Sequence, residues 1–319
     1  MSSLICGSIA YDTIMSFEGR FQDQILADQI HILNVAFLVP SMRREFGGCA
    51  GNIAYNLKLL GGEPVIMATV GGDAGSYYDQ LAKYQISVDH IRELPEAFTA
   101  QAMITTDRDN NQITAFHPGA MSESHLNRVA DVVTHRQSKA LNVPKIAIVA
   151  PDGRQGMIEH CQQLADAKID FIFDPGQGLP MFDGKDLLGF IEQATYVAVN
   201  DYEGEMLSQR TGLSLKQISE RVEALIVTKG SQGAEIHTKG QQIDIPVVPV
   251  TKAIDPTGCG DAFRGGLLYG LEQGFDWATT GRLASLMGSI KIASQGPQNH
   301  QPSREAIQSQ FKKAFNYSF

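Results

Sequence analysis

The stretch Asp255-Pro256-Thr257-Gly258-Cys259-Gly260-Asp261-Ala262-Phe263 places two carboxylates around a Gly-x-Gly turn, directly before an apolar-periodic segment at 262–271. That periodicity predicts a helix, so the turn lies at a helix N-terminus. Backbone N–H groups there have no intrahelical acceptor, and the helix dipole adds partial positive charge, which suits phosphate oxygens. Asp261 is a carboxylate beside this turn that can accept the proton of an attacking hydroxyl. The stretch indicates phosphoryl transfer, although an ordinary helix start with a first-turn Asp has the same pattern.

The composition is that of an ordinary globular protein of one large domain or two small ones. The chain has 319 residues, of which 43% are hydrophobic and 19% charged. The formal charge of 26 − 35 = −9 argues against a nucleic-acid-binding surface. No secretory signal and no run of about 18 apolar residues is visible, so we expect a cytoplasmic protein with no membrane contact. Four scattered cysteines without zinc spacing fit reduced thiols, and they are Cys6, Cys49, Cys161 and Cys259.

Strand and helix signals alternate along most of the chain. Strands are predicted at 4–10, 64–70, 145–149, 171–173, 196–199 and 225–228, with helices between them and two more helices after the one at 262. This order predicts a doubly wound, mostly parallel α/β sheet with helices on both faces. Asp12 follows the first strand, where ligands of such sheets bind. Residues 30–39 have strand character, and 98–106 and 112–117 flank a turn signal and predict a hairpin. We expect a single domain over 1–319 with a small β lid built from about 13–46 and 97–120.

Four other motifs fit ligand binding, and each has a plainer structural alternative. The segment Gly47-Gly48-Cys49-Ala50-Gly51-Asn52 fits close approach of the backbone to a ligand, or a tight helix entry. Asn200 and Glu203 share a helix face and fit water around Mg²⁺, or a helix cap. The turn Thr228-Lys229-Gly230-Ser231-Gln232-Gly233 fits nucleotide phosphates or ribose, or a hairpin. His117 fits a substrate contact, or a structural histidine.

Together these motifs resemble the ribokinase-like (PfkB) carbohydrate kinases over essentially the whole length, and within them the adenosine kinase branch. The signature Asp-x-Thr-Gly-x-Gly-Asp is matched by 255–261, with Cys259 where that family usually has Ala. Gly47, Gly48 and Asn52 match its Gly-Gly-x-x-x-Asn helix start. Its Asn-x-x-Glu motif is matched at 200–203.

The resemblance implies a catalytic base at Asp261, beside an anion hole. The N–H groups implied for that hole belong to Gly258, Cys259 and Gly260. The residues implied for holding ribose hydroxyls are Asp12, Gly47, Gly48 and Asn52. The resemblance also implies ATP and Mg²⁺, with Asn200 and Glu203 organising the metal and the phosphates. The residues implied for the ATP site are Thr228, Gly230 and Gly233, and Asp255 is implied for a K⁺ ion that members of that family often use.

The lid segment resembles bacterial nucleoside kinases more than ribokinase. A nucleoside needs an apolar or aromatic slot for its base, and the candidates for this slot are Phe37, Phe116 and Met121, with His117 beside them. We therefore expect transfer of phosphate from ATP to the 5′-hydroxyl of a nucleoside, with adenosine first. We expect a monomer, or a homodimer formed through the lid.

Three other functions remain open from the sequence. A sugar or sugar-phosphate kinase needs basic residues in the sugar pocket, which Arg43, Arg44 and Arg264 would supply. A non-catalytic nucleotide sensor would use the fold for binding alone. A nicotinamide dehydrogenase is disfavoured, since Phe263 stands where its fingerprint needs a third glycine.

Overall fold

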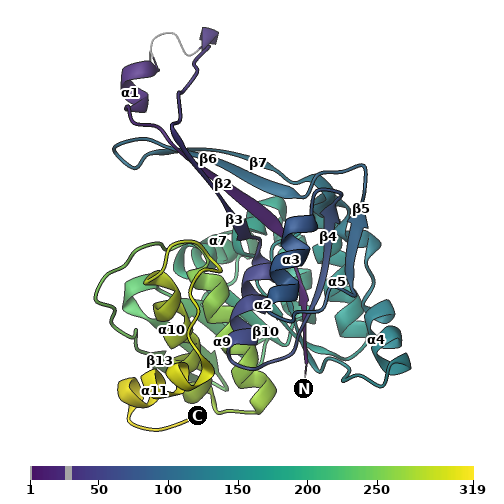
Figure 1. Ribbon diagram of the computed structural model, residues 1–319. Helices are drawn as coiled ribbons and strands as arrows, with labels where there is room; N and C mark the ends of the chain where they lie inside the picture. The colour runs from purple at the N-terminus through teal and green to yellow at the C-terminus, as the bar shows by residue number, and fades with distance from the viewer. Residues whose placement is uncertain (1, 26–30) are drawn as a thin grey trace.

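A nine-stranded sheet forms the body of the computed structural model, which describes residues 2–25 and 31–319. Its strand order is β13-β12-β11-β10-β9-β8-β1-β4-β5, and Figure 1 shows β13 and β5 on opposite sides of the body. Neighbours pair in parallel except β11–β12 and β12–β13. The strands are β1 (Ser3–Cys6), β4 (Pro64–Gly71), β5 (Ile91–Leu94), β8 (Ile146–Val149), β9 (Asp170–Phe173), β10 (Tyr196–Asn200), β11 (Ala224–Thr228), β12 (Ala234–Thr238) and β13 (Gln241–Ile245). The predicted doubly wound, mostly parallel sheet is confirmed.

Helices cover both faces of this sheet, because alternate strand residues point to opposite sides. Ile5 of β1 joins the apolar cluster of one face, whereas Leu4 and Cys6 join the other. The first face carries α2 (Cys49–Leu59), α3 (Gly75–Lys83), α9 (Cys259–Gln273), α10 (Trp277–Ile292) and α11 (Arg304–Phe315). The second carries α4 (Val129–Ser138), α5 (Arg154–Asp166), α6 (Gly184–Gln193), α7 (Asp201–Thr211) and α8 (Leu215–Ser219). None of the helices in the described ranges has the length and apolarity of a bilayer span.

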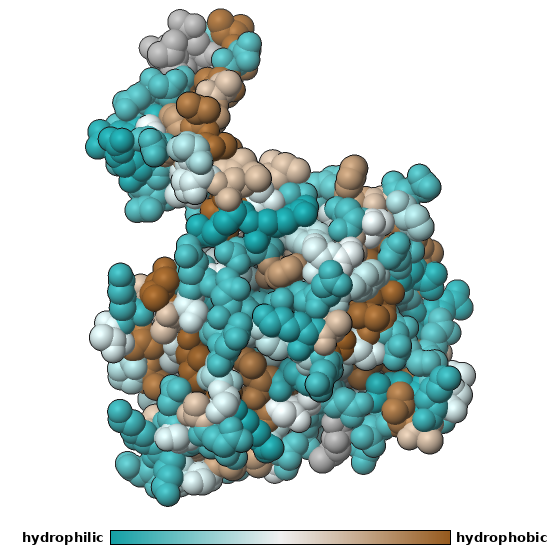
Figure 2. Space-filling view, viewed as in Figure 1, coloured by the Kyte–Doolittle hydropathy of each residue, from teal (hydrophilic) through white to brown (hydrophobic). Residues whose placement is uncertain are grey.

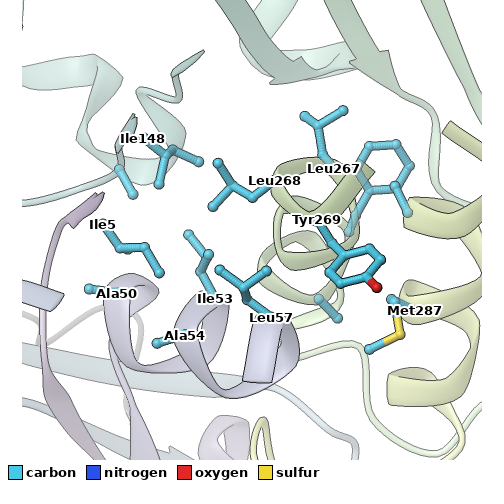
Figure 3. Close-up of a cluster of buried hydrophobic side chains, with 14 of the residues drawn as sticks. Ile5, Ala50, Ile53, Ala54, Leu57, Ile148, Leu267, Leu268, Tyr269 and Met287 are labelled. Atoms are coloured by element: carbon cyan, nitrogen blue, oxygen red, sulfur yellow. The ribbon is translucent and has the colours of Figure 1, made fainter. Parts of the chain in front are cut away.

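Helix α9 lies between α2 and α10 at very close range, and Figure 3 shows the apolar side chains that meet there. Two glycines permit this approach. A Cβ on Gly265 would lie 2.7 Å from the Cβ of Asn56 on α2, and one on Gly266 would lie 2.6 Å from the Cα of Ala284 on α10. Larger side chains would push the helices apart. The close packing therefore fixes where the N-terminus of α9 points.

A second, four-stranded sheet has the order β3-β2-β6-β7. Its strands are β2 (Ala10–Ser16), β3 (Ser41–Gly47), β6 (Ala100–Thr106) and β7 (Gln112–His117), so the predicted hairpin is confirmed. Nearly all of it comes from the two ranges predicted for the lid. Between β2 and β3, residues 17–25 and 31–40 extend away from the body, and the first of these two stretches carries the short helix α1 (Phe21–Gln24) (Figure 1).

Two strand predictions were wrong. Residues 4–10 do not form one strand, because the chain leaves the large sheet after Cys6 and enters the small sheet at Ala10. Ser8 fixes this step, since its N–H donates to the Pro151 carbonyl (3.1 Å) and its carbonyl accepts from Ala50 (2.9 Å). Residues 31–39 form no strand, and residue 30 lies outside the described residues. Their apolar side chains are largely exposed, and the exposed fraction of Leu38 is 85%. An apolar run forms a strand only where a neighbouring strand can pair with it through backbone hydrogen bonds.

Candidate active site

The N-terminus of α9 presents open backbone amides. Gly258 is the residue before the helix and has φ 78°, a conformation that favours glycine. The Cys259 N–H is already used, because it donates to the Pro256 carbonyl (3.1 Å). Within residues 2–25 and 31–319, no acceptor faces the N–H groups of Gly258, Gly260 or Asp261. The predicted anion hole therefore keeps two of its three amides open, and the amide of Asp261 is a third.

Asp261 lies in the first turn of α9, beside these amides. Its Oδ2 accepts a hydrogen bond of 2.8 Å from Nδ2 of Asn52 on α2. Burial raises the pKa of Asp261 to about 7, and the negative charge of Asp174 adds to this, while the bond from Asn52 opposes it. A carboxyl group that titrates near neutral pH suits a general base.

Arg264 lies one turn further along α9 and is committed to an ion pair. Its Nε and one terminal nitrogen each donate over 3.1 Å to the two carboxylate oxygens of Asp174, which follows β9. Both side chains are buried, so the geometry is that of a strong bidentate pair. The other two arginines considered for a sugar phosphate are also engaged. Arg43 pairs with Glu45 at 3.3 Å, and Arg44 lies over the Tyr11 ring at 4.0 Å.

The side chain of Asn52 is oriented by a chain of hydrogen bonds. Its Oδ1 accepts from Nε2 of the buried Gln298 (3.0 Å), which also donates to the Tyr77 hydroxyl (2.8 Å). That hydroxyl donates to the Gly47 carbonyl (2.7 Å). With Oδ1 held in this way, Nδ2 of Asn52 is left to face Asp261. The segment after α10 is thus linked to the Asp261 carboxylate through α2.

Gly48 and Gly47 serve close packing at the start of α2. A Cβ on Gly48, whose φ is 82°, would lie 2.6 Å from the Ser8 carbonyl oxygen. The Ser8 oxygens accept from the amides of Cys49 and Ala50, so this helix start is tied to the chain. At Gly47 a Cβ would lie 2.6 Å from Oδ2 of Asp12, so glycine leaves room for that carboxylate. Gly48 therefore fits the alternative of a tight helix entry, because its backbone packs directly against Ser8.

Asp12 lies on one face of the small sheet with Phe116. Asp12 on β2 pairs with Glu45 on β3 and with Ala102 on β6, and Ala102 pairs with Phe116 on β7. Directly paired residues point to the same face of a sheet. Burial, with the charges of Glu45 and Asp255, raises the pKa of Asp12 to about 6. This face therefore joins a carboxylate to a half-exposed aromatic ring.

The other residues predicted to contact the substrate or its base belong to other parts of the structure than the Asp12 face of the small sheet's strands. His117 pairs with Gln101, which pairs with Tyr11, so His117 belongs to the opposite face, and its ring packs edge-on against Phe98. Phe37 packs against Phe17 and Phe21, with ring centroids 4.9 and 5.0 Å away, in the extended segment. Met121 lies in the short helix η2 (Gly119–Leu126) after β7. Among the predicted residues that lie in the described strands, register brings Phe116 and not His117 to the face of Asp12.

Asn200 and Glu203 form a capping box at the start of α7. Oδ1 of Asn200 accepts from the Glu203 N–H (2.7 Å), and Oε2 of Glu203 accepts from the Asn200 N–H (2.8 Å). Burial raises the pKa of Glu203, and the charge of Asp174 adds to this. Asn200 and Glu203 therefore cap the helix, which is the structural alternative to a metal site. This arrangement leaves Oε1 of Glu203 for another partner.

The loop after β11 is a tight turn between antiparallel strands, as the hairpin alternative states. Gly230 and Gly233 have φ of 54° and 89°, and the Lys229 N–H donates to the Gly233 carbonyl (2.8 Å). Thr228 is the strand partner of Asn200, so both motifs meet at the carboxyl edge of the large sheet. A hollow of about 480 Å³ borders the turn at Lys229 and Gln232.

Four residues at this site were missed by the sequence analysis. Asp174 follows a strand end, so the rule that singled out Asp12 would also have found it. Glu45, Lys291 and Gln298 carry no local signal, since each reaches the site only through the fold. Lys291 is fully buried near Asp255, the residue implied for K⁺.

Comparison with known proteins gives relatives over the whole chain. The profile described as pfkB family carbohydrate kinase matches residues 14–304. A nucleoside kinase of Methanocaldococcus jannaschii is 32% identical over 286 residues, which cover 88% of this chain and 90% of that protein. The solved structure of a nucleoside kinase of Burkholderia thailandensis in complex with inosine is 56% identical, covers 99% of both chains and gives a TM-score of 0.88. The same kinase in complex with ADP-inosine is 57% identical, covers 99% of this chain and 97% of its own, and gives a TM-score of 0.86.

Proposed function

The chain belongs to the pfkB family of carbohydrate kinases, and we propose that it transfers the γ-phosphoryl group of ATP to the 5′-hydroxyl of a purine nucleoside. Adenosine and inosine are the proposed acceptors. The observation that carries the proposal is the first turn of α9, where a carboxylate held by Asn52 lies beside open helix amides. The nucleoside kinases that match nearly the whole chain support the choice of acceptor class.

In the proposed reaction Asp261 acts as the general base. It takes the proton of the 5′-hydroxyl as that oxygen bonds to the γ-phosphorus and the bond from this phosphorus to the ADP oxygen breaks. The amides of Gly258, Gly260 and Asp261 would stabilise the negative charge on the transferring group. Much of the rate would come from positioning and preorganised electrostatics, which the packing of α9 between α2 and α10 supports.

The residues assigned to Mg²⁺ and to ATP lie at the carboxyl edge of the large sheet. Mg²⁺ prefers oxygen ligands and usually keeps several waters, and Oε1 of Glu203 with the nearby Asn200 fits such a shell. When bound, Mg²⁺ would neutralise charge on the phosphates of ATP. We assign Thr228, Gly230 and Gly233 to the ATP side, because their turn adjoins Asn200.

The acceptor would lie between α9 and the small sheet. Asp12 and Asn52 supply polar groups for ribose hydroxyls, and Phe116 supplies an aromatic face for the base. Closure of the small sheet as a lid would exclude water and suppress hydrolysis of ATP. A sugar-phosphate acceptor is disfavoured, because Arg43 and Arg264 are paired with Glu45 and Asp174, and the Arg44 guanidinium lies over the Tyr11 ring.

The test is ADP release from ATP and Mg²⁺ by the purified protein with single acceptors. Adenosine, inosine, pyrimidine nucleosides, ribose and fructose 6-phosphate are compared. We expect turnover with the purine nucleosides and little with the free sugars. Turnover with ribose or fructose 6-phosphate alone would overturn the acceptor assignment but leave Asp261 as the base. No turnover with any acceptor would overturn the kinase proposal.

A further inference from the structure

Lys291 is a fully buried lysine in the last turn of α10, and its ammonium group is held by backbone oxygens. Nζ donates to the carbonyl oxygen of Asp255 over 2.7 Å and to that of Ser294 over 3.0 Å. The relative exposure of Lys291 is 0%. A lysine is almost never buried to this extent unless its charge is compensated. Burial lowers the pKa of the Lys291 ammonium group, and the negative charges of Asp255 and Glu45 oppose this shift.

This ammonium group occupies the oxygen donors that a K⁺ ion near Asp255 would need. Carbonyl oxygens bind K⁺ by replacing its hydration shell, and an ammonium group donates its three hydrogens to the same kind of oxygen. With Nζ on the carbonyls of Asp255 and Ser294, the residues present do not fit K⁺ at this position. The chain therefore departs at Asp255 from the K⁺ site that the family resemblance implied.

We infer that the ammonium group of Lys291 is a built-in monovalent cation, which orders the turn at Asp255 so that no K⁺ is required. The inference rests on the proposed kinase function, since the turn at Asp255 leads into the amides proposed to bind phosphate. A positively charged residue at the C-terminus of α10 also interacts favourably with the dipole of that helix.

The structure connects Lys291 to those amides by short steps. The N–H groups of Ile254 and Asp255 donate to the carbonyl of Ile292, the residue after Lys291, at 2.8 and 3.2 Å. The Asp255 carboxylate accepts from the amides of Thr257 (2.9 Å) and Gly296 (2.8 Å). Both ends of the residue are thereby fixed, its carbonyl by the cation and its carboxylate by amides.

The turn also lies against the segment that follows α10. A Cβ on Gly258 would lie 2.7 Å from the Cβ of Pro297, so the two segments are in close contact. Loss of the cation at Lys291 would release the Asp255 carbonyl and with it the contact that positions Gly258. Lys291 is thus a positioning residue for the amides proposed to bind phosphate, because its ammonium group acts through the backbone oxygens of Asp255 and Ser294.

The first experiment uses the unmodified protein. Kinetics with ATP and inosine or adenosine are measured while KCl replaces choline chloride at a constant ionic strength of about 0.1 M. We expect kcat and KM for ATP to stay within about twofold, because the cation is part of the chain. Activation of about tenfold or more by K⁺ over choline would overturn the inference.

The second experiment compares Lys291→Ala with Lys313→Ala, which removes an exposed lysine of α11. In choline chloride we expect Lys291→Ala to lower Tm and to reduce kcat/KM by about 10²-fold, as for a misplaced catalytic segment. K⁺ or NH₄⁺ should partly restore Tm and kcat/KM in Lys291→Ala. Neither salt should change these two quantities in Lys313→Ala.

The two readouts separate this inference from the kinase proposal. If no acceptor is phosphorylated in either salt, the kinase proposal fails, and the salt dependence of Tm still decides the role of Lys291. An unchanged Tm in Lys291→Ala, or a lowered Tm that K⁺ and NH₄⁺ do not raise, would overturn the inference. If Lys291→Ala does not fold, the K⁺ titration of the unmodified protein decides.

Discussion

The carboxyl edge of the large sheet and the small sheet differ in how firmly they hold their functional groups. At the large sheet the strands are buried, and Asn52, Gln298 and Arg264 hold the groups around Asp261. In the small sheet every residue of β7 is exposed, and Phe116 is 53% exposed. Figure 2 shows apolar side chains on the surface of the segment that projects beyond the small sheet. The groups proposed for the chemical step are thus held in place by other residues, whereas the Phe116 ring proposed to contact the base still faces solvent.

This difference implies that substitutions in the two regions separate kinetically. Groups fixed before substrate arrives contribute mainly to the chemical step, so their loss lowers kcat. A solvent-facing group that is buried only by the nucleoside contributes mainly to binding, so its loss raises KM. Three substitutions and one pH titration test this division.

Asp261→Asn removes the proposed base and leaves the shape of the site. We expect kcat to fall by roughly 10²–10⁴-fold or more, with nucleoside binding retained. The measurements are steady-state kinetics and calorimetric titration with inosine. Asp79→Asn, at an exposed carboxylate of α3, is the control and should match the unmodified protein. Near-normal turnover by Asp261→Asn would remove Asp261 from the mechanism.

The pH dependence follows from the ionisation of Asp261. The base must be deprotonated, and its pKa is raised to about 7, mainly by burial. We therefore expect kcat/KM for the nucleoside to fall about tenfold per pH unit below that value and to level off above it. Below pH 6 protonation of Asp12, whose pKa is also raised to about 6, should steepen the decline. A profile without an inflection between pH 5 and 8 would contradict this.

Gln298→Ala removes the donor that orients Asn52. We expect kcat to fall about tenfold, because the hydrogen bond from Asn52 to Asp261 weakens. Loss of that bond should also raise the pKa of Asp261, so the inflection of the pH profile should move upward. Asn299→Ala is the control, since it changes a neighbouring amide that donates to Glu45 instead. An unmoved inflection in Gln298→Ala would assign Gln298 a purely structural role.

Phe116→Ala removes the aromatic ring from the face of Asp12. We expect KM for the nucleoside to rise about tenfold with little change in kcat, because the ring would contribute to binding alone. Thermal stability should be unaffected, since the ring is half-exposed. Ile113→Ala lies on the same strand but on the opposite face, and it should leave KM unchanged. Equal effects of the two substitutions would mean that the face of Asp12 does not bind the base.

Much of the fold followed from local signals in the sequence. Strand-length apolar runs and helix periodicity repeat at short range, and they predicted the parallel sheet, the hairpin and the helix after Gly258. They failed where pairing decides structure. Nothing local reveals that the run through Ser8 divides between two sheets, or that residues 31–39 have no strand partner in the described structure.

The candidate site divides in the same way. The helix start with its open amides and Asp261 could be predicted from the sequence, because helix termini, glycine turns and first-turn acids are local features. Three contacts depend on the folded chain: Asn52 donates to Asp261, Gln298 orients Asn52 from 246 residues away, and Lys291 donates to the Asp255 carbonyl. The tertiary structure also decided that Phe116 and not His117 shares a face with Asp12, because strand register sets the face. Contacts between distant segments arise from packing, and no spacing along the chain encodes them.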